Sequence, residues 1–313
     1  MDYMILGRTG LKVSVAGLGC GGPSRLGLRQ KKREKEAVAL VRQALDLGVN
    51  FLDTAEWYGT EHIVGAAIAQ TPRDRLVVST KKNIPPVDHP DPGGEVSKSV
   101  EQSLKTLHTD YVDVYHVHGV YPGQYEYVKE RLLPSLVQMR QQGKIRAVGI
   151  TERFPDDPTH KVLRQALQDD CWDVIMIGFN LLNPCARKEV FRLTQKQGVG
   201  VINMYAVRRG LSQPARWKGI CADLVEKGVA GAETLNPDDP LDFVIKDGGA
   251  STIPEAAYRF CRHEPGVHVV LTGTGNPDHL RANVEAIMKP ALPEPVLRRL
   301  ADIFGNVDWV SGN

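Results

Sequence analysis

The chain repeats one pattern: a short apolar run, a loop, and then a stretch with apolar residues at helical spacing. Continuous apolar runs are typical of parallel strands that are covered on both faces, and the 3.6-residue period of the other stretches indicates amphipathic helices. The predicted strands are Val15–Gly21, Asn50–Glu56, Leu76–Lys81, Val112–His118, Ala147–Thr151, Val174–Asn180, Val199–Ala206 and Val267–Gly273. The predicted helices span residues 34–47, 61–70, 96–108, 126–142, 158–168, 185–197, 252–262 and 277–288.

Eight strands alternating with helices favour an α/β fold of the (β/α)₈ TIM-barrel type over a six-stranded doubly wound sheet. We expect residues 1–313 to form one such domain. Met1–Ser14 precedes the first strand and carries the turn signals Gly7 and Thr9-Gly10, which predict a hairpin or cap. Residues 212–250 are rich in Gly, Pro and Asp, and we expect a long loop there, after strand seven.

Composition narrows the class of protein further. Hydrophobic residues make up 42% and charged residues 24%, which is ordinary for a globular chain and excludes a disordered or fibrous one. The net charge of +2 gives no reason to expect nucleic acid or a membrane surface as partner. No apolar run approaches a membrane span, and the first residues do not resemble a signal peptide. Five cysteines without a CxxC motif argue against a disulfide framework or zinc site, so we expect a cytoplasmic location.

The predicted first strand ends in a glycine-rich segment, Gly17–Gly22, which matches GxGxxG. A dinucleotide fingerprint of this kind must open a helix, and here Pro23 and Gly27 interrupt one. We therefore interpret the segment as a tight turn between strand and helix.

Polar side chains lie at the C-terminal ends of three consecutive predicted strands. In a (β/α)₈ barrel the catalytic residues lie at this end of the strands. Asp53 and Tyr58 follow strand two, Lys81 ends strand three and His118 ends strand four. We call these four residues the tetrad. Taken singly, the four have ordinary structural interpretations: a helix cap for Asp53, a packed aromatic for Tyr58, a surface charge for Lys81 and a core residue for His118. Together they suit proton transfer by the tyrosine. We expect Lys81, held by Asp53, to lower the pKa of the Tyr58 phenol, and His118 to donate to a carbonyl oxygen.

Two further features suggest ligands. His116 and His118 point to the same side of one strand, and with Asp53 they raise the alternative of a metal-dependent hydrolase, although further ligands are not evident and Lys81 disfavours a cation. After strand eight, a glycine-rich turn leads to Asn276-Pro277, a good helix start that predicts a phosphate site or an ordinary capped helix.

At this point the chain resembles the aldo-keto reductase family along nearly its whole length. The resemblance rests on LGRTGLKVSVAGLG (6–19), ALDLGVNFLDTAEWYG (44–59), VVSTK ending at Lys81, DYVDVYHVH (110–118), GKIRAVGIT (143–151) and GTGNPDHLRANV (273–284). It implies a (β/α)₈ barrel that binds NADPH, with NADH as the alternative, and acts on a small carbonyl or alcohol substrate. It assigns Tyr58 as proton donor, Asp53 and Lys81 as the pair that tunes it, and His118 as the group that orients the carbonyl.

The resemblance also implies the remaining site residues. Cofactor contacts map to Gly21, Thr151, Met204, Tyr205, Ala206, Arg208, Arg209, Gly210, Leu211, Gly273, Thr274, His279 and Asn283. Of these, Tyr205–Leu211 would wrap the pyrophosphate. The substrate pocket maps to Trp57, His116 and Glu152.

Four positions depart from the family pattern. Glu152 stands where an asparagine usually follows Thr151, and Met176 stands where a glutamine is usual. Either Met204 or Tyr205 takes the place of the aromatic that stacks on nicotinamide, and His279 replaces a usual arginine. The sequence therefore predicts an NAD(P)H-dependent aldehyde or ketone reductase, with a non-catalytic cofactor-binding regulatory module of the same fold as the alternative.

Overall fold

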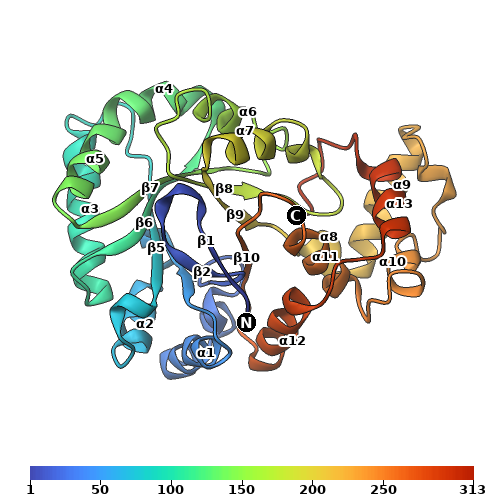
Figure 1. Ribbon diagram of the computed structural model, residues 1–313, viewed down its shortest axis with the longest axis horizontal. Coiled ribbons are helices and arrows are strands. Elements are labelled where there is room, and N and C mark those ends of the chain that lie inside the picture. The colour runs from blue at the N-terminus through green and yellow to red at the C-terminus, as the bar shows by residue number, and fades with distance from the viewer.

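The computed structural model describes all 313 residues and contains a closed barrel of parallel strands (Figure 1). The strands follow one another around the barrel in chain order, and the last pairs with the first. They are β3 (Ala16–Gly19), β4 (Phe51–Asp53), β5 (Val77–Asn83), β6 (Val112–Val120), β7 (Ile145–Glu152), β8 (Val174–Gly178), β9 (Gly200–Met204) and β10 (Val269–Thr272). The predicted barrel is thereby confirmed.

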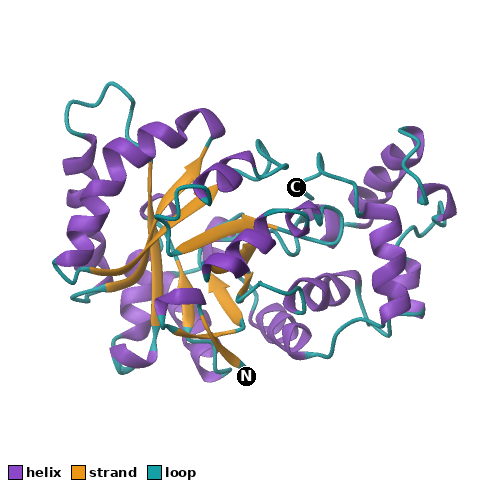
Figure 2. Cartoon of the chain, turned by 45° about the horizontal axis from the view of Figure 1, so that its top comes forward, coloured by secondary structure: helices purple, strands orange, loops and turns teal.

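The helices lie around the outside of the barrel (Figure 2). Those between or after the strands are α1 (Glu34–Asp46), α2 (Glu61–Ile68), α3 (Pro92–Leu107), α4 (Tyr125–Tyr127), α5 (Leu133–Gln141), α6 (Lys161–Ala166), α7 (Val190–Gln197), α11 (Ile253–Arg262) and α12 (Pro277–Met288). A turn of π-helix at Val128–Leu132 joins α4 to α5, so the helix predicted over 126–142 is continuous in direction but not in type. No helix is both long and apolar enough to span a membrane.

The expectation of a long loop over 212–250 is wrong. This region contains α8 (Arg209–Ser212), α9 (Pro214–Glu226) and α10 (Asp242–Lys246), and a helix we did not predict, α13 (Glu294–Phe304), lies beside them (Figure 1). Helix α9 forms because Trp217, Cys221 and Leu224 recur on one face and are buried, which outweighs the glycine and proline content around it.

The N-terminal residues form the predicted hairpin, in which β1 (Tyr3–Ile5) pairs antiparallel with β2 (Lys12–Ser14). Leu6, Leu11 and Val13 of the hairpin segment join the side chains inside the barrel in one buried cluster. The other members of this inner core are Phe51, Val77, Val114, Ala147, Val174, Met176, Ile202 and Val269. The hairpin therefore plugs the end of the barrel at which the strands begin.

Strand geometry places the polar side chains of the tetrad directly above this inner core. Side chains along a strand alternate between faces, so Lys81 shares a face with Val77, and His118 shares a face with Val114. Because the strands are parallel and in register, both polar residues reach the same open end of the barrel.

Candidate active site

A buried ion pair forms the base of the site. The Nζ of Lys81 donates to both carboxylate oxygens of Asp53, at 2.6 and 2.7 Å, and to the Thr54 carbonyl oxygen at 2.7 Å. The Ser79 hydroxyl donates to the same carboxylate at 2.9 Å. Burial alone would lower the pKa of Lys81, but the charge and hydrogen bonds of Asp53, together with the nearby Tyr58, outweigh it and raise that pKa above its ordinary value. Lys81 is therefore a fixed positive charge.

Tyr58 lies directly over this pair. It ends a 3-10 turn, Glu56–Tyr58, and the Lys81 Nζ lies 5.1 Å from the centroid of its ring. Its hydroxyl is 3.4 Å from Nε2 of His118, and the two rings meet edge to face. Gly21 supports the ring from the other side, because a Cβ at that position would lie 2.3 Å from the ring. The structure thus brings all four members of the tetrad together.

The pKa of Tyr58 differs from our expectation. We predicted that Lys81 would lower it, but burial raises the pKa of the phenol above 10, and Lys81 offsets only part of that effect. The main reason is that the folded chain removes the hydroxyl from water, and the charge of Asp53 adds a smaller effect in the same direction. Tyr58 is therefore a neutral phenol at pH 7, with its proton in place.

The two histidines of β6 have different positions. Burial, together with Lys81 and Arg153, lowers the pKa of His118 to about 3, so its ring is neutral and carries one N–H. His116 was predicted to line the substrate pocket, but it is fully buried one layer lower, and neither ring nitrogen has a partner. It does not line the cavity described below, although His118, two residues further along the same strand, does. No three His, Cys, Asp or Glu side chains are grouped as a metal site requires.

A cavity of about 820 Å³ opens above the tetrad. Its floor includes Asp53, Tyr58, His118 and Met176. The predicted cofactor residues in its wall are Gly21, Thr151, Met204, Tyr205, Arg208 and Gly273. Its outer part is lined by Trp57, Asn83, Tyr121, Gln124, Arg153 and Asp156. Trp57 is 66% exposed, so its indole forms a free surface at the mouth.

The remaining predicted cofactor residues lie outside this cavity. Ala206 lies in the turn before α8, and Arg209, Gly210 and Leu211 lie in α8 itself, where the Gly210 amide donates to the carbonyl oxygen of Gly312 at 2.9 Å. The C-terminal segment therefore already binds one amide that we assigned to the pyrophosphate.

The start of α12 holds the other outlying residues, Thr274, His279 and Asn283. The Asn276 side chain accepts hydrogen bonds from the amides of Asp278 and His279, so these two amides are not free for a phosphate. His279 is exposed, and Asn283 donates to Thr272.

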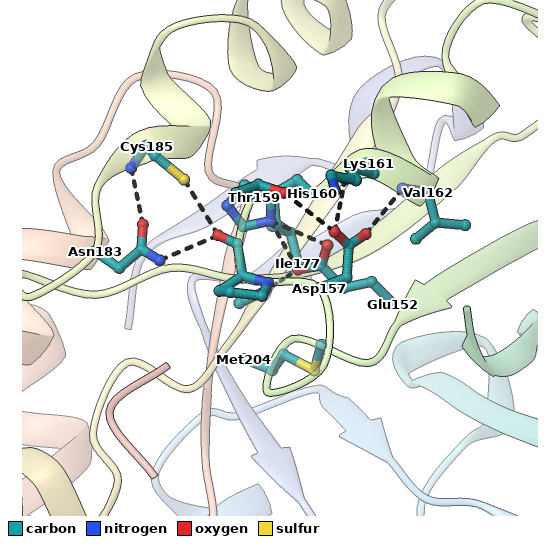
Figure 3. Close-up of polar contacts among 12 residues, drawn as sticks. Glu152, Asp157, Thr159, His160, Lys161, Val162, Ile177, Asn183, Cys185 and Met204 are labelled. Atoms are coloured by element: carbon teal, nitrogen blue, oxygen red, sulfur yellow. Dashed lines mark hydrogen bonds and ion pairs between the residues drawn. The ribbon is translucent and has the colours of Figure 1, made fainter. Parts of the chain in front are cut away.

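Glu152 was predicted to contact the substrate or cofactor, but its side chain is fully buried. Although the residue contributes to the cavity wall, its carboxylate accepts from Nδ1 of His160 and from the Gly178 amide (Figure 3). The carboxylate is therefore occupied within the protein.

Three features of the site escaped the sequence analysis. Lys32 donates to the Gly275 carbonyl oxygen at 2.8 Å, so residues 25–32 fold over the turn that leads into α12. The basic run from Arg29 to Arg33 was the available signal. Arg153 lies over the Tyr121 ring at the mouth, and His160 pairs with Glu152; both depend on tertiary contacts that have no local pattern.

The fold, the tetrad and the cavity above it define a class of protein that the comparisons with known proteins identify. Residues 17–303 match the model of the aldo/keto reductase family, and the chain belongs to that family of oxidoreductases. It is 33% identical to L-galactose dehydrogenase of Arabidopsis thaliana over 100% of this chain and 98% of the relative. It is 27% identical to the uncharacterized oxidoreductase YqkF of Bacillus subtilis, over 94% of each chain. Among solved structures, the apo form of the aldo-keto reductase AKR11C1 from Bacillus halodurans is similar with a TM-score of 0.73 and 25% identity, covering 97% of this chain and 96% of that one.

Proposed function

We propose that this protein is an NAD(P)H-dependent oxidoreductase that interconverts an aldehyde or ketone with its alcohol. The observation that carries the proposal is the placement of a neutral phenol, Tyr58, over the buried Asp53–Lys81 pair and beside neutral His118. Tyr58 and His118 both face the cavity, so both can reach one carbonyl oxygen.

Each polar group has a distinct task in this proposal. The Tyr58 hydroxyl donates its proton to the carbonyl oxygen, and His118 donates its N–H to the same oxygen as negative charge develops there. Lys81 stabilises the phenolate that remains after the proton has left. Asp53 fixes the lysine, so that the charge is in place before the reaction begins.

The residues present fit a dinucleotide. Tyr58, Tyr205 and Gly273 follow three different strands and line the same cavity, whose volume of about 820 Å³ has room for such a ligand. The Arg208 guanidinium lies 4.3 Å from the centroid of the Tyr205 ring, and its buried Nε has no partner. Arg208 would therefore hold a phosphate, and Thr151 and Tyr205 would contact the nicotinamide. When bound, the cofactor supplies the hydride from C4 of its nicotinamide ring.

The mouth of the cavity favours a polyhydroxylated substrate. Asn83, Gln124 and Asp156 present hydrogen-bonding groups there, and the exposed Trp57 indole offers a flat apolar face. Sugars present both kinds of surface. The Arabidopsis relative is named for its action on L-galactose, and we propose a sugar-like aldehyde or alcohol as substrate here as well.

The decisive experiment is the Tyr58→Phe variant. Turnover should fall by about a thousandfold or more, while NADPH and NADH bind as in the native protein, because the phenyl ring keeps its packing on Gly21. Tyr111→Phe is the matched control, since it removes a tyrosine hydroxyl just before the start of β6, away from the cavity, and it should keep turnover within about threefold.

Unchanged turnover in Tyr58→Phe would refute the assigned proton donor. Cofactor binding by the native protein with no turnover on any of a broad set of sugars and carbonyls would instead support the non-catalytic module.

A further inference from the structure

A buried acid–base pair lies behind the cavity wall, outside the tetrad. Glu152 ends β7, and both of its carboxylate oxygens lie 3.0 Å from Nδ1 of His160, the residue that precedes α6 (Figure 3). One of these oxygens also accepts from the Gly178 amide at the end of β8, at 2.8 Å. The side chains of Glu152 and His160 are 0% and 1% exposed. The pair therefore joins two strand ends to the start of a helix.

Burial raises the pKa of the Glu152 carboxyl, and the carboxylate in turn favours a protonated His160. Burial alone would lower the pKa of His160, but the Glu152 carboxylate and the Cys185 side chain together outweigh it, so that the pKa is raised to about 10. His160 is thus an imidazolium across the physiological range. A buried ion pair of this kind contributes little net stability compared with two apolar side chains, so stability alone does not explain its presence.

Two aromatic contacts connect the pair to the cavity. The Phe154 ring stacks on the His160 ring, with centroids 5.3 Å apart and an interplanar angle of 4°. Its edge meets the Tyr205 ring at 5.5 Å and 72°. Phe154 is held close to the barrel, because a Cβ on Gly178 would lie 2.1 Å from its ring. Displacing His160 would therefore displace Phe154, and with it the support of Tyr205.

Tyr205 needs that support. Its φ of 66° lies in the left-handed region, which a non-glycine residue occupies only when its surroundings hold it there. Phe154 lies on one side, and the Arg208 guanidinium lies over the ring. The Tyr205 ring then forms part of the cavity wall near Thr151.

We propose that Glu152 and His160 are positioning residues for the nicotinamide half of the cofactor, acting through Phe154 on Tyr205. The inference rests on the proposed function. Glu152 cannot act as the usual asparagine would, because its carboxylate is occupied, and Met176 offers no strong hydrogen bond. The nicotinamide then depends on the placement of the Tyr205 ring more than on side-chain hydrogen bonds.

The test compares the whole cofactor with a fragment that lacks nicotinamide. Dissociation constants are measured by calorimetry for NADPH and 2′-phospho-ADP-ribose, and for NADH and ADP-ribose. Glu152→Gln should weaken binding of the preferred dinucleotide about tenfold, and binding of its fragment by less than about twofold. Phe154→Leu keeps the ion pair but removes the stacked ring, and it should give the same selective loss. Asp113→Asn is the matched control: this buried carboxylate also accepts from a strand amide, Val78, and pairs with Arg73, but at the opposite end of the barrel.

Each binding result either supports or overturns the inference. Selective loss in Glu152→Gln and Phe154→Leu, with Asp113→Asn unchanged for both ligands, supports the inference. Native-like dinucleotide binding by these two variants, or an equal loss for dinucleotide and fragment, overturns it while the proposed function stands. If Glu152→Gln does not fold, Phe154→Leu alone decides. Failure of the native protein to bind either dinucleotide overturns the proposed function and this inference with it.

Discussion

Replacing Lys81 by methionine would leave the buried carboxylate of Asp53 without its cation. The native pair is almost inaccessible to solvent, and the lysine makes three hydrogen bonds of 2.6–2.7 Å. Removing one partner of a buried ion pair costs about 3–5 kcal/mol, because the remaining charge has been taken out of water without compensation. In Lys81→Met only the Ser79 hydroxyl would still donate to the carboxylate. We therefore expect the free energy of unfolding at pH 7 to fall by about 3–5 kcal/mol.

The matched double variant separates charge from packing. Asp53→Asn leaves Lys81 unpaired and should cost a similar amount, whereas Asp53→Asn with Lys81→Met removes both charges. The double variant should be no less stable than either single one, which makes the coupling at least about 3 kcal/mol. Urea unfolding followed by circular dichroism measures all three free energies.

The pH dependence supplies an independent check on the same reasoning. Burial raises the pKa of Asp53 above its ordinary value even beside Lys81, and removal of the lysine takes away the main opposing effect. A folded-state pKa above the unfolded value means that the folded state binds the proton more tightly. The deficit of Lys81→Met should therefore shrink as the pH falls from 7 towards 5. Additive single effects, or a deficit that grows at lower pH, would refute the argument.

Three further predictions follow from contacts in and behind the cavity. Gly21→Ala places a Cβ 2.3 Å from the Tyr58 ring, so turnover should fall about tenfold or more while the thermal unfolding temperature stays near native. Native turnover would show that the position of the ring against Gly21 does not matter. Gly178→Ala brings a Cβ to 2.1 Å from the Phe154 ring, and the unfolding free energy should drop by about 1–3 kcal/mol in urea titrations. The pKa of His160 is raised from 6.5 to about 10, so its stabilisation is complete below pH 6.5 and is lost as the pH rises towards 10. The stability difference between native protein and His160→Gln should shrink over that window by roughly 4–5 kcal/mol at most, and a constant difference would contradict the assigned charge.

The barrel and the positions of the tetrad residues could both be predicted from the sequence, and for the same reason. Each strand is a nearly continuous apolar run, so a charged residue at its end stands out and marks the open rim. Asp53, Lys81 and His118 were found in this way, and strand alternation then brought them together. The outer helices were harder, because α9 and α13 are stabilised by their packing against other elements rather than by position in the repeat.

The errors within the site have a common cause. The direction of the Tyr58 pKa depends on how much water the folded chain excludes, which no local pattern encodes. Glu152 and His160 are eight residues apart across a loop, and only the path of that loop turns the carboxylate away from the cavity. His116 has the alternation of a pocket residue, but the depth at which it lies along the barrel axis is a tertiary property.

The hairpin that plugs the barrel has a consequence for biosynthesis. Its apolar residues Leu6, Leu11 and Val13 are synthesised more than 250 residues before Val269, yet all four pack in one core. Their binding surface does not exist until nearly the whole chain has been translated. Closing contacts over such sequence separations is slow, and exposed apolar segments on unfinished chains aggregate. The hairpin segment thus stays exposed while the strands of the barrel are being made, a period in which a chaperone that shields it would improve the yield of folded protein.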